Sequence, residues 1–265
     1  MRQLYSFYYD AFGIALKSIL EHKLRALLTL LGIIIGVAAV VVVGASISGL
    51  KTYVVDQVSK VLGSNHFMIT RMASTGHMSD EEYERRNRRN KDVTWEEYEY
   101  IRDNCRLCSY VGAQMNAGAD LKEGTAEMPS TRIIGSTDTM YEIEDKTLVA
   151  GRFFSNEEVQ RSAKVAVIGH DVVEKFFEFT SPVGKTIKIR GVTLQIIGVE
   201  QKRGSFFGQS QDRHIYIPIT LHNQIFNRTG GIQVHGKTIE KEPFKPAIEE
   251  AELLLRNKRQ LVGSE

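Results

Sequence analysis

The residues with the most reactive chemistry in this sequence are two cysteines, Cys105 and Cys108, in a C-x-x-C arrangement. A zinc site of this kind needs four ligands, and the sequence has no second cysteine pair to complete one. A thioredoxin-like redox motif needs a sequence setting that the neighbouring residues do not provide. The pair therefore predicts a local disulfide or two idle thiols, with redox function as the minor alternative.

The other candidates for chemistry are a glycine–lysine–threonine run and seven scattered histidines. Gly184-Lys185-Thr186 resembles the end of a phosphate-binding loop, but that loop requires an earlier glycine where this chain has Phe179. The sequence contains no HExxH, GxSxG or clustered carboxylate motif. We therefore predict no catalytic, cofactor-binding or metal-binding residue, and interpret the histidines as surface or structural: His22, His66, His77, His170, His214, His222 and His235.

The element on which the rest of the chain depends is an uncharged stretch from Ala26 to Leu50. At about 25 residues it is long enough for a helix to cross a hydrocarbon core of ~30 Å. A buried helix of a soluble domain rarely runs so long without a polar stripe, so we predict a transmembrane helix at 26–50. The main alternative is a cleaved signal peptide, with Gly44-Ala45-Ser46 as a weak cleavage site, but its apolar core would be shorter.

Two glycines within this stretch, Gly32 and Gly36, form a GxxxG step. Two missing side chains on one helix face allow a second helix to approach closely, in a solvent that offers no hydrophobic drive for association. We therefore name Gly32 and Gly36 as candidate helix-packing residues. The alternative is the ordinary use of glycine in membrane helices.

The segments on either side of this helix predict its orientation and its extension. Basic residues are more frequent before it than after it, which predicts a cytoplasmic N-terminus and an extracytoplasmic location for everything after Lys51. Residues 1–25 have the pattern of an amphipathic helix, which would lie in the headgroup layer or pack on a partner domain. Residues 51–63 continue the helical pattern as a stalk that ends at Gly63 and either passes on motion or acts as a spacer.

The remaining residues, 64–265, contain patterns of both strands and helices. The formal net charge of the chain is only +2, which gives no reason to expect nucleic acid as a partner. Two capping boxes, Thr94 with Glu97 and Ser155 with Glu158, predict helix starts, and Met72–Asp92 has the composition of a polar loop. The expected strands are 66–71, 109–119, 127–135, 164–169, 182–189, 192–199, 214–219 and 231–235, and the expected helices include 94–104, 171–179 and 245–261. Glu123-Gly124 and Arg190-Gly191 are the expected turns of two hairpins.

The order of several short motifs resembles the MacB-type permeases of the FtsX-like superfamily of ABC transporters. The resemblance covers nearly all of the chain and is carried by LKSILEHKLRALLTLLGIIIGVAAVVVVGAS at the start, GRFF at 151–154, VAVIG at 165–169, PVGKTIKI at 182–189, IIGV at 196–199, YIPI at 216–219 and AIEEAELLLRNKRQL at 247–261. Each motif is weak alone, and the series is more specific than its parts.

The resemblance implies an α+β fold, with an N-terminal amphipathic helix and one transmembrane helix followed by a two-lobed extracytoplasmic α+β domain. The membrane-proximal lobe would comprise about 64–120 and 220–265, and the inserted lobe about 121–219. Such permeases have three further membrane helices, so we expect this chain to be a fragment or a truncated gene product.

The resemblance also implies a function, which is to couple cytoplasmic ATP hydrolysis to motion of the extracytoplasmic domain for export or release of a substrate. The implied partners are a separate ABC ATPase subunit, a second permease copy, a periplasmic adaptor protein and membrane lipid, and the implied location is a bacterial inner membrane. No enzymatic activity is expected of this chain itself. The alternative is a single-pass membrane-anchored extracytoplasmic binding module without transport activity.

Overall fold

The computed structural model describes residues 13–14, 17, 20–62, 65–72, 79–206, 208–227, 231–238 and 244–261. Most of the predicted amphipathic helix at 1–25, and the predicted helix terminator Gly63, lie outside these residues. The chain divides into two compact units, Met1–Asp56 and Gln57–Glu265.

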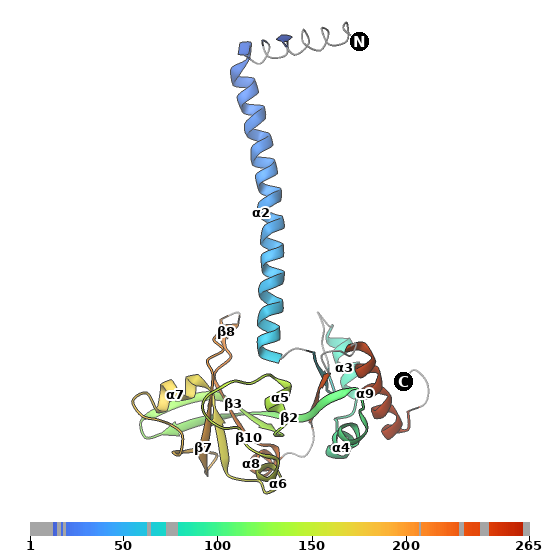
Figure 1. The fold of residues 1–265 in the computed structure, drawn as a ribbon, viewed down its shortest axis with the longest axis vertical. Coiled ribbons are helices and arrows are strands. Elements are labelled where there is room, and N and C mark those ends of the chain that lie inside the picture. Colours follow the sequence, from blue (N-terminus) through green and yellow to red (C-terminus); the bar gives the residue numbers. More distant parts are fainter. Residues whose placement is uncertain are drawn as a thin grey trace. The chain divides into compact units, whose positions relative to one another are not determined.

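The first long element is a single unbroken helix, α2, from Lys23 to Leu62 (Figure 1). Its 40 residues include the whole predicted membrane stretch and nearly all of the predicted stalk. At 1.5 Å per residue it is about 60 Å long. The stalk is therefore the continuation of the apolar helix and not a separate element.

The second unit is built on a mixed sheet, which contains nine strands in the described part of the chain. The strand order is β1-β11-β2-β3-β10-β5-β7-β4, with β6 paired to β7 outside this path. The pairs β10–β3 and β5–β7 are parallel and the other pairs are antiparallel. The strands are β1 (His66–Ile69), β2 (Cys108–Glu123), β3 (Ala126–Ser136), β4 (Leu148–Gly151), β5 (Val165–Ile168), β6 (Thr186–Ile189), β7 (Val192–Glu200), β10 (His214–Pro218) and β11 (Gln233–Thr238), and a separate small ribbon pairs β8 (Ser205–Phe206) with β9 (Gln209–Ser210).

The two turns that the sequence predicted for hairpins are present. β2 and β3 form a long antiparallel hairpin around Glu123 and Gly124, as expected, although both strands extend further than predicted. β6 and β7 are joined by Arg190 and Gly191, which have φ values of 46° and 87°. Positive φ at both positions is the geometry that matches the twist of a two-residue hairpin.

The hydrophobic core consists of two clusters on opposite faces of this sheet. Because side chains alternate along a strand, neighbouring residues of β3 and β10 belong to different clusters. Ile134 and Tyr216 pack in one cluster, whereas Ile133 and Ile215 pack in the other. The predicted lobe boundaries near residues 120 and 220 do not coincide with these faces and stay a prediction.

Both predicted capping boxes start helices. Thr94 and Glu97 cap α4 (Trp95–Asn104), and Ser155 and Glu158 cap α6 (Asn156–Gln160). Glu97 has a second role, because both of its carboxylate oxygens accept from the Arg259 guanidinium at 2.7 and 2.9 Å. This contact fastens α4 to the last helix, α9 (Phe244–Arg259). The other helices are α5 (Met140–Ile143), α7 (His170–Phe176) and α8 (Ile219–Phe226).

One prediction for the segment 72–92 is wrong, because residues Asp80–Arg89 form a helix, α3, and not a loop. The Ser79 hydroxyl accepts from the Glu82 backbone N–H at its start. Acidic residues fill its first turn and arginines its last, which complements the helix dipole. The ion pairs Glu82–Arg86 and Glu84–Arg88, four residues apart, add further local support.

Candidate functional site: a membrane helix and a buried ionic network

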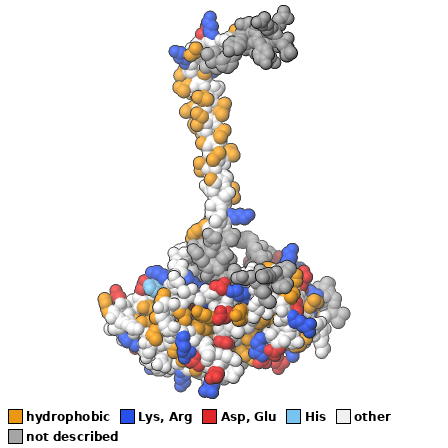
Figure 2. All heavy atoms as spheres, in the orientation of Figure 1, with side chains coloured by type: hydrophobic (Ala, Val, Ile, Leu, Met, Phe, Trp, Pro, Cys, Tyr) orange, Lys and Arg blue, Asp and Glu red, His pale blue; other side chains and the backbone are white. Residues whose placement is uncertain are grey.

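The first candidate functional element is the apolar part of α2. By length and composition, Lys23–Val54 can cross a membrane. Its leucine, isoleucine and valine side chains have no protein cover, and Leu24 and Val40 are each 73% exposed. Figure 2 shows these side chains along the helix, with basic groups at its ends. So large an uncovered apolar surface requires lipid or another helix around it.

The predicted packing residues Gly32 and Gly36 both lie on α2. No atom lies within 4 Å of the position that a Cβ would take at either glycine. The two positions are four residues apart and therefore share one face of the helix. That face is open within the described part of the chain, which leaves room for the close approach of another helix.

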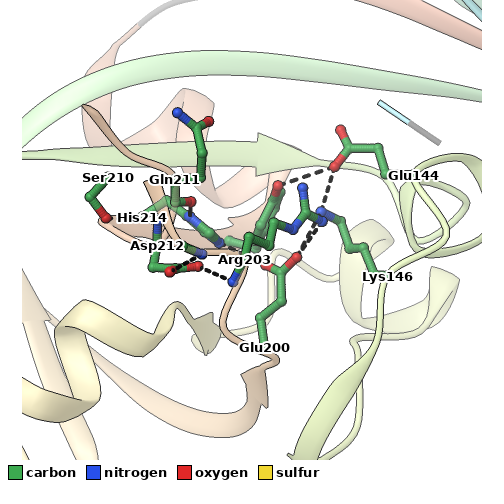
Figure 3. Close-up of polar contacts among 10 residues, drawn as sticks. Glu144, Lys146, Glu200, Arg203, Ser210, Gln211, Asp212 and His214 are labelled. Atoms are coloured by element: carbon green, nitrogen blue, oxygen red, sulfur yellow. Dashed lines mark hydrogen bonds and ion pairs between the residues drawn. The ribbon is translucent and has the colours of Figure 1, made fainter. Parts of the chain in front are cut away.

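A second candidate element is a buried network of charged side chains, which the sequence did not single out (Figure 3). At its centre the Lys146 ammonium, fully buried, lies 2.5 Å from Glu144 Oε2 and 3.7 Å from Glu200 Oε1. It also lies 3.7 Å from the centroid of the Tyr216 ring, whose hydroxyl donates to Glu144 Oε2 at 3.2 Å. Interactions with two carboxylates and an aromatic face therefore offset the desolvation cost of the buried ammonium.

Glu200, at the end of β7, is the most highly connected carboxylate of the network. His214 Nε2 lies 2.7 Å from its Oε2, and the Arg203 guanidinium pairs with its Oε1. Burial alone would raise the pKa of Glu200, but the positive charge of Lys146 and the contacts with His214 and Arg203 outweigh it. The pKa of Glu200 is consequently held well below its usual range. Glu200 is thus a permanent anion in the folded domain.

The network fastens the segment between β7 and β10, which carries the β8–β9 ribbon. The Asp212 carboxylate accepts from the backbone N–H groups of Arg203 and Gly204, each at 2.8 Å. Ser210 Oγ donates to Asp171 Oδ2 on α7 at 2.6 Å. A carboxylate that accepts backbone N–H groups fixes the path of the chain, so the start and the end of this segment are held to each other, and Ser210 joins the segment to α7.

The His214 ring lies between two oxygen atoms. Its Nδ1 is 2.9 Å from the Gln211 carbonyl oxygen, and its Nε2 is 2.7 Å from Glu200 Oε2. The basic side chains of Lys146 and Arg203 and the carboxylates of Glu144, Glu200 and Asp212 complete the network. Because these side chains are almost fully enclosed, the network can clamp the fold but offers no access to a substrate.

Two further histidines form a pair between β1 and β11. His66 Nε2 lies 2.8 Å from His235 Nδ1, and the two rings are stacked with centroids 4.9 Å apart. Burial, reinforced by the neighbouring His66, lowers the pKa of His235 to about 3. His235 is therefore neutral at physiological pH, in agreement with a structural role.

The remaining candidates from the sequence occupy ordinary structural positions. Cys105 and Cys108 form a disulfide between the end of α4 and the start of β2. Gly184 has a φ of 89° and lies in the turn before β6, as expected for a strand entry and not for a phosphate-binding loop. Among the residues that the structure describes, no three histidine, cysteine, aspartate or glutamate side chains gather as a metal site.

No motif in the sequence predicted the buried network. Its members come from α5, β7, β10 and the segments between them, over some 70 residues of chain, so no spacing rule connects them. The available signal was the position of charged residues at the ends of buried strands. Glu200 ends VTLQIIGVE and His214 begins HIYIP.

These observations define the class of the protein as an α+β extramembrane domain joined in sequence to one candidate membrane-spanning helix. The model of the MacB-like periplasmic core domain matches residues 26–252. The chain belongs to this family.

The similarity to individual proteins agrees with this assignment. The chain is 32% identical over 220 residues to the macrolide export ATP-binding/permease protein MacB of Neisseria meningitidis, covering 82% of this chain and 33% of that protein. It is 27% identical over 254 residues to the MacB protein of Chlorobaculum tepidum, covering 95% of this chain and 38% of that one. The chain thus spans about a third of the length of these relatives.

Solved structures confirm the fold. The periplasmic region of MacB from Actinobacillus actinomycetemcomitans superposes with a TM-score of 0.62 at 18% identity, covering 77% of this chain and 87% of that one. The extracellular domain of the noncanonic ABC-type transporter YknZ from Gram-positive bacteria gives a TM-score of 0.56 at 19% identity. This match covers 73% of this chain and 93% of that one. The predicted α+β class and the predicted family are confirmed.

Proposed function

We propose that this chain is the N-terminal part of a permease subunit of a MacB-type ABC transporter. It couples ATP hydrolysis in the cytoplasm to motion of its extracytoplasmic domain, and so to export or release of a substrate. The ATP is hydrolysed on a separate ATPase subunit, and this chain is not itself an enzyme. The family, and the relatives named above as ATP-binding/permease proteins, support the permease role and its link to ATP.

The single observation that carries the proposed mechanism is the continuity of α2. At about 60 Å, the helix is about twice as long as the hydrocarbon core of ~30 Å that its apolar part would cross. A helix without a break resists bending, so a displacement at its membrane part is delivered to its far end. A loop or a hinge at the same position would absorb that displacement.

The proposed partners follow from the exposed surfaces of α2. Lipid covers its apolar side chains, and a second permease copy packs against the face of Gly32 and Gly36. The N-terminus lies in the cytoplasm of a cell with the domain outside the inner membrane, where a periplasmic adaptor binds it. The exported substrate is handled by the assembled transporter and not by this chain alone.

The experiment that tests this mechanism breaks α2 just beyond its apolar part. Thr52 is exposed and its hydroxyl bonds to the Ser48 carbonyl of the preceding turn. Thr52→Pro removes a backbone N–H and clashes with that turn, which kinks or breaks the helix. Thr52→Ala is the matched control, because it removes the same hydroxyl and keeps the backbone bond.

The assay uses the full chain reconstituted in lipid nanodiscs with its ATPase subunit. A cysteine introduced at Val149, which is exposed on β4, carries a donor dye in one permease copy and an acceptor dye in the other. Energy transfer between the dyes reports the separation of the two extracytoplasmic domains when ATP is added. We expect an ATP-dependent change in wild type and in Thr52→Ala, and none in Thr52→Pro. An undiminished change in Thr52→Pro would refute coupling through α2, and failure of the wild-type chain to bind an ATPase subunit would refute the transporter assignment.

A further inference from the structure

The helix α3 is unusual because it contributes nothing to the core of its own domain. None of its ten residues is buried, and Tyr83, its one large apolar side chain, is 52% exposed. A ten-residue helix is too short to be stable in water on propensity alone. Local caps and ion pairs support it. Because no face of the helix is buried, a face remains available to a partner.

The contacts of α3 with its domain define which face is available. The Arg71 guanidinium donates to the Asn87 carbonyl at 2.5 Å, and the Asn90 side-chain amide donates to the Arg71 carbonyl at 2.8 Å. At 100° per residue, these contacts place the side of Tyr83 and Asn90 toward the domain. The opposite, outward face consists of exposed charged residues only: Glu81, Glu84, Arg85, Arg88 and Arg89.

The charges on this outward face are separated along the helix axis. Its N-terminal half carries Glu81 and Glu84, and its C-terminal half carries Arg85, Arg88 and Arg89. Glu84 and Arg88 pair with each other, yet both stay largely in water, 68% and 82% exposed. The side chains of Glu81, Arg85 and Arg89 make no ion pair or hydrogen bond with any residue that the structure describes. The face is thus a dipole with unsatisfied charge at both ends.

We propose that this face binds the same face of α3 from a second copy of the chain, with the two helices antiparallel. Reversal of direction places the acidic half of each helix against the basic half of the other. In a register that sets Glu84 opposite Arg85 of the second copy, Glu81 faces Arg88, and the exposed Asp80 at the edge of the face lies opposite Arg89, so every facing pair has opposite charge. The interface is then isologous, with one patch used twice about a two-fold axis.

The charge order favours a second copy over a membrane surface. Anionic lipid headgroups attract the arginines of the basic half, but they repel the acidic half of the same short helix. An antiparallel copy of the same helix attracts both halves. The inference deepens the proposed function, because it rests on the pairing of two permease copies and names a surface through which their domains meet.

The test uses two variants of the full chain that make the outward face uniform. Asp80→Arg/Glu81→Arg/Glu84→Arg makes the six interface positions wholly basic, and Arg85→Glu/Arg88→Glu/Arg89→Glu makes them wholly acidic. Each variant opposes like charges in its own pair, whereas the two variants mixed oppose a basic helix to an acidic one. A helix that has merely unfolded in either variant is not repaired by mixing.

The readout is energy transfer between donor-labelled and acceptor-labelled chains in lipid vesicles over a series of protein-to-lipid ratios. We expect self-association of each variant to be about tenfold weaker than wild type, and the mixture to recover it. At 1 M salt the differences shrink, because charges are screened over about 3 Å.

Several outcomes overturn the proposal, and they separate it from the proposed function. Undiminished self-association of both variants would show that copies pair through another surface, while the permease assignment stands. Weak association that mixing does not recover would also reject the antiparallel pairing. Variants that pair normally, with the acidic one alone losing a dependence on anionic lipid, would assign the face to the membrane. Wild-type chains that never associate would count against the proposed pairing itself.

Discussion

Replacement of the buried Lys146 ammonium gives a sharp test of the ionic clamp. Lys146→Met keeps the approximate length of the side chain and removes its charge. After this change the Glu144 carboxylate keeps its hydrogen bond from the Tyr216 hydroxyl at 3.2 Å but has lost its nearest cation, whereas Glu200 keeps His214 and Arg203. A buried carboxylate that loses its cation is left with an uncompensated cost of desolvation.

The magnitude follows from the burial of the group. Lys146 has no exposed side-chain surface, and removal of one partner from a fully buried pair costs about 3–5 kcal/mol. For a domain of this size each kcal/mol lowers the melting temperature by about 2–4 °C, so we expect a decrease of roughly 6–20 °C. Lys188→Met is the matched control on the exposed side of β6 and should change stability by less than about 0.5 kcal/mol.

The assay is thermal and urea unfolding of the full chain in detergent, followed by circular dichroism. The double variant Lys146→Met/Glu144→Gln removes the stranded carboxylate as well, so its loss should be smaller than the sum of the two single losses. A loss below about 1 kcal/mol in Lys146→Met, or strict additivity in the double variant, would refute the idea that the pair acts as a clamp.

The pH dependence has a defined sign. Burial alone would raise the pKa of Glu144, but Lys146 and other positive groups lower it below the usual 4.5. Its carboxylate therefore contributes stability that is fully present above pH 4.5 and is lost as the pH falls through the folded-state pKa. Lys146→Met removes the main group that lowers this pKa, so the acid-induced loss that Glu144 causes should disappear from the variant.

Two further predictions concern the histidine pair and the membrane helix. Because the pKa of His235 is about 3 in the folded domain and 6.5 in the reference state, the unfolded chain binds an extra proton between these values. The free energy of unfolding should therefore fall as the pH is lowered through this window, by up to ~1.4 kcal/mol per pH unit. His235→Gln should reduce this pH dependence, as measured by urea unfolding at pH 7 and pH 5. An equal pH dependence in wild type and variant would contradict the prediction. On α2, Gly32→Leu/Gly36→Leu should weaken self-association in a membrane two-hybrid assay. The control Ala38→Leu/Ala45→Leu, on the opposite face, should not. Unchanged self-association of the glycine variant would show that these glycines are not in the interface.

Local sequence signals predicted local structure well. The capping boxes at Thr94 and Ser155, the hairpin turn at Arg190 and Gly191, and the C-terminal amphipathic helix are all present. Each depends on interactions within a few residues, so its sequence carries the necessary information. The same reasoning missed α3, because a helix with no apolar face has no hydrophobic period to detect.

The sequence by itself determined the apolar helix, the α+β class of the domain and the family resemblance. These properties follow from composition, from periodicity and from the order of short motifs along the chain. They can be predicted without knowing which strands are neighbours in the sheet.

Only the tertiary structure decided the ionic clamp and the outward face of α3. Lys146 and Glu200 meet because β4 pairs with β7, and His214 joins them from β10, which lies beyond β5 in the sheet. The strength of these charges comes from burial, and burial is a property of the packed sheet that no run of residues encodes locally. Likewise, the charge pattern of α3 is readable in the sequence, but the contacts of Asn87 and its C-cap Asn90 with Arg71 decide which charges face outward.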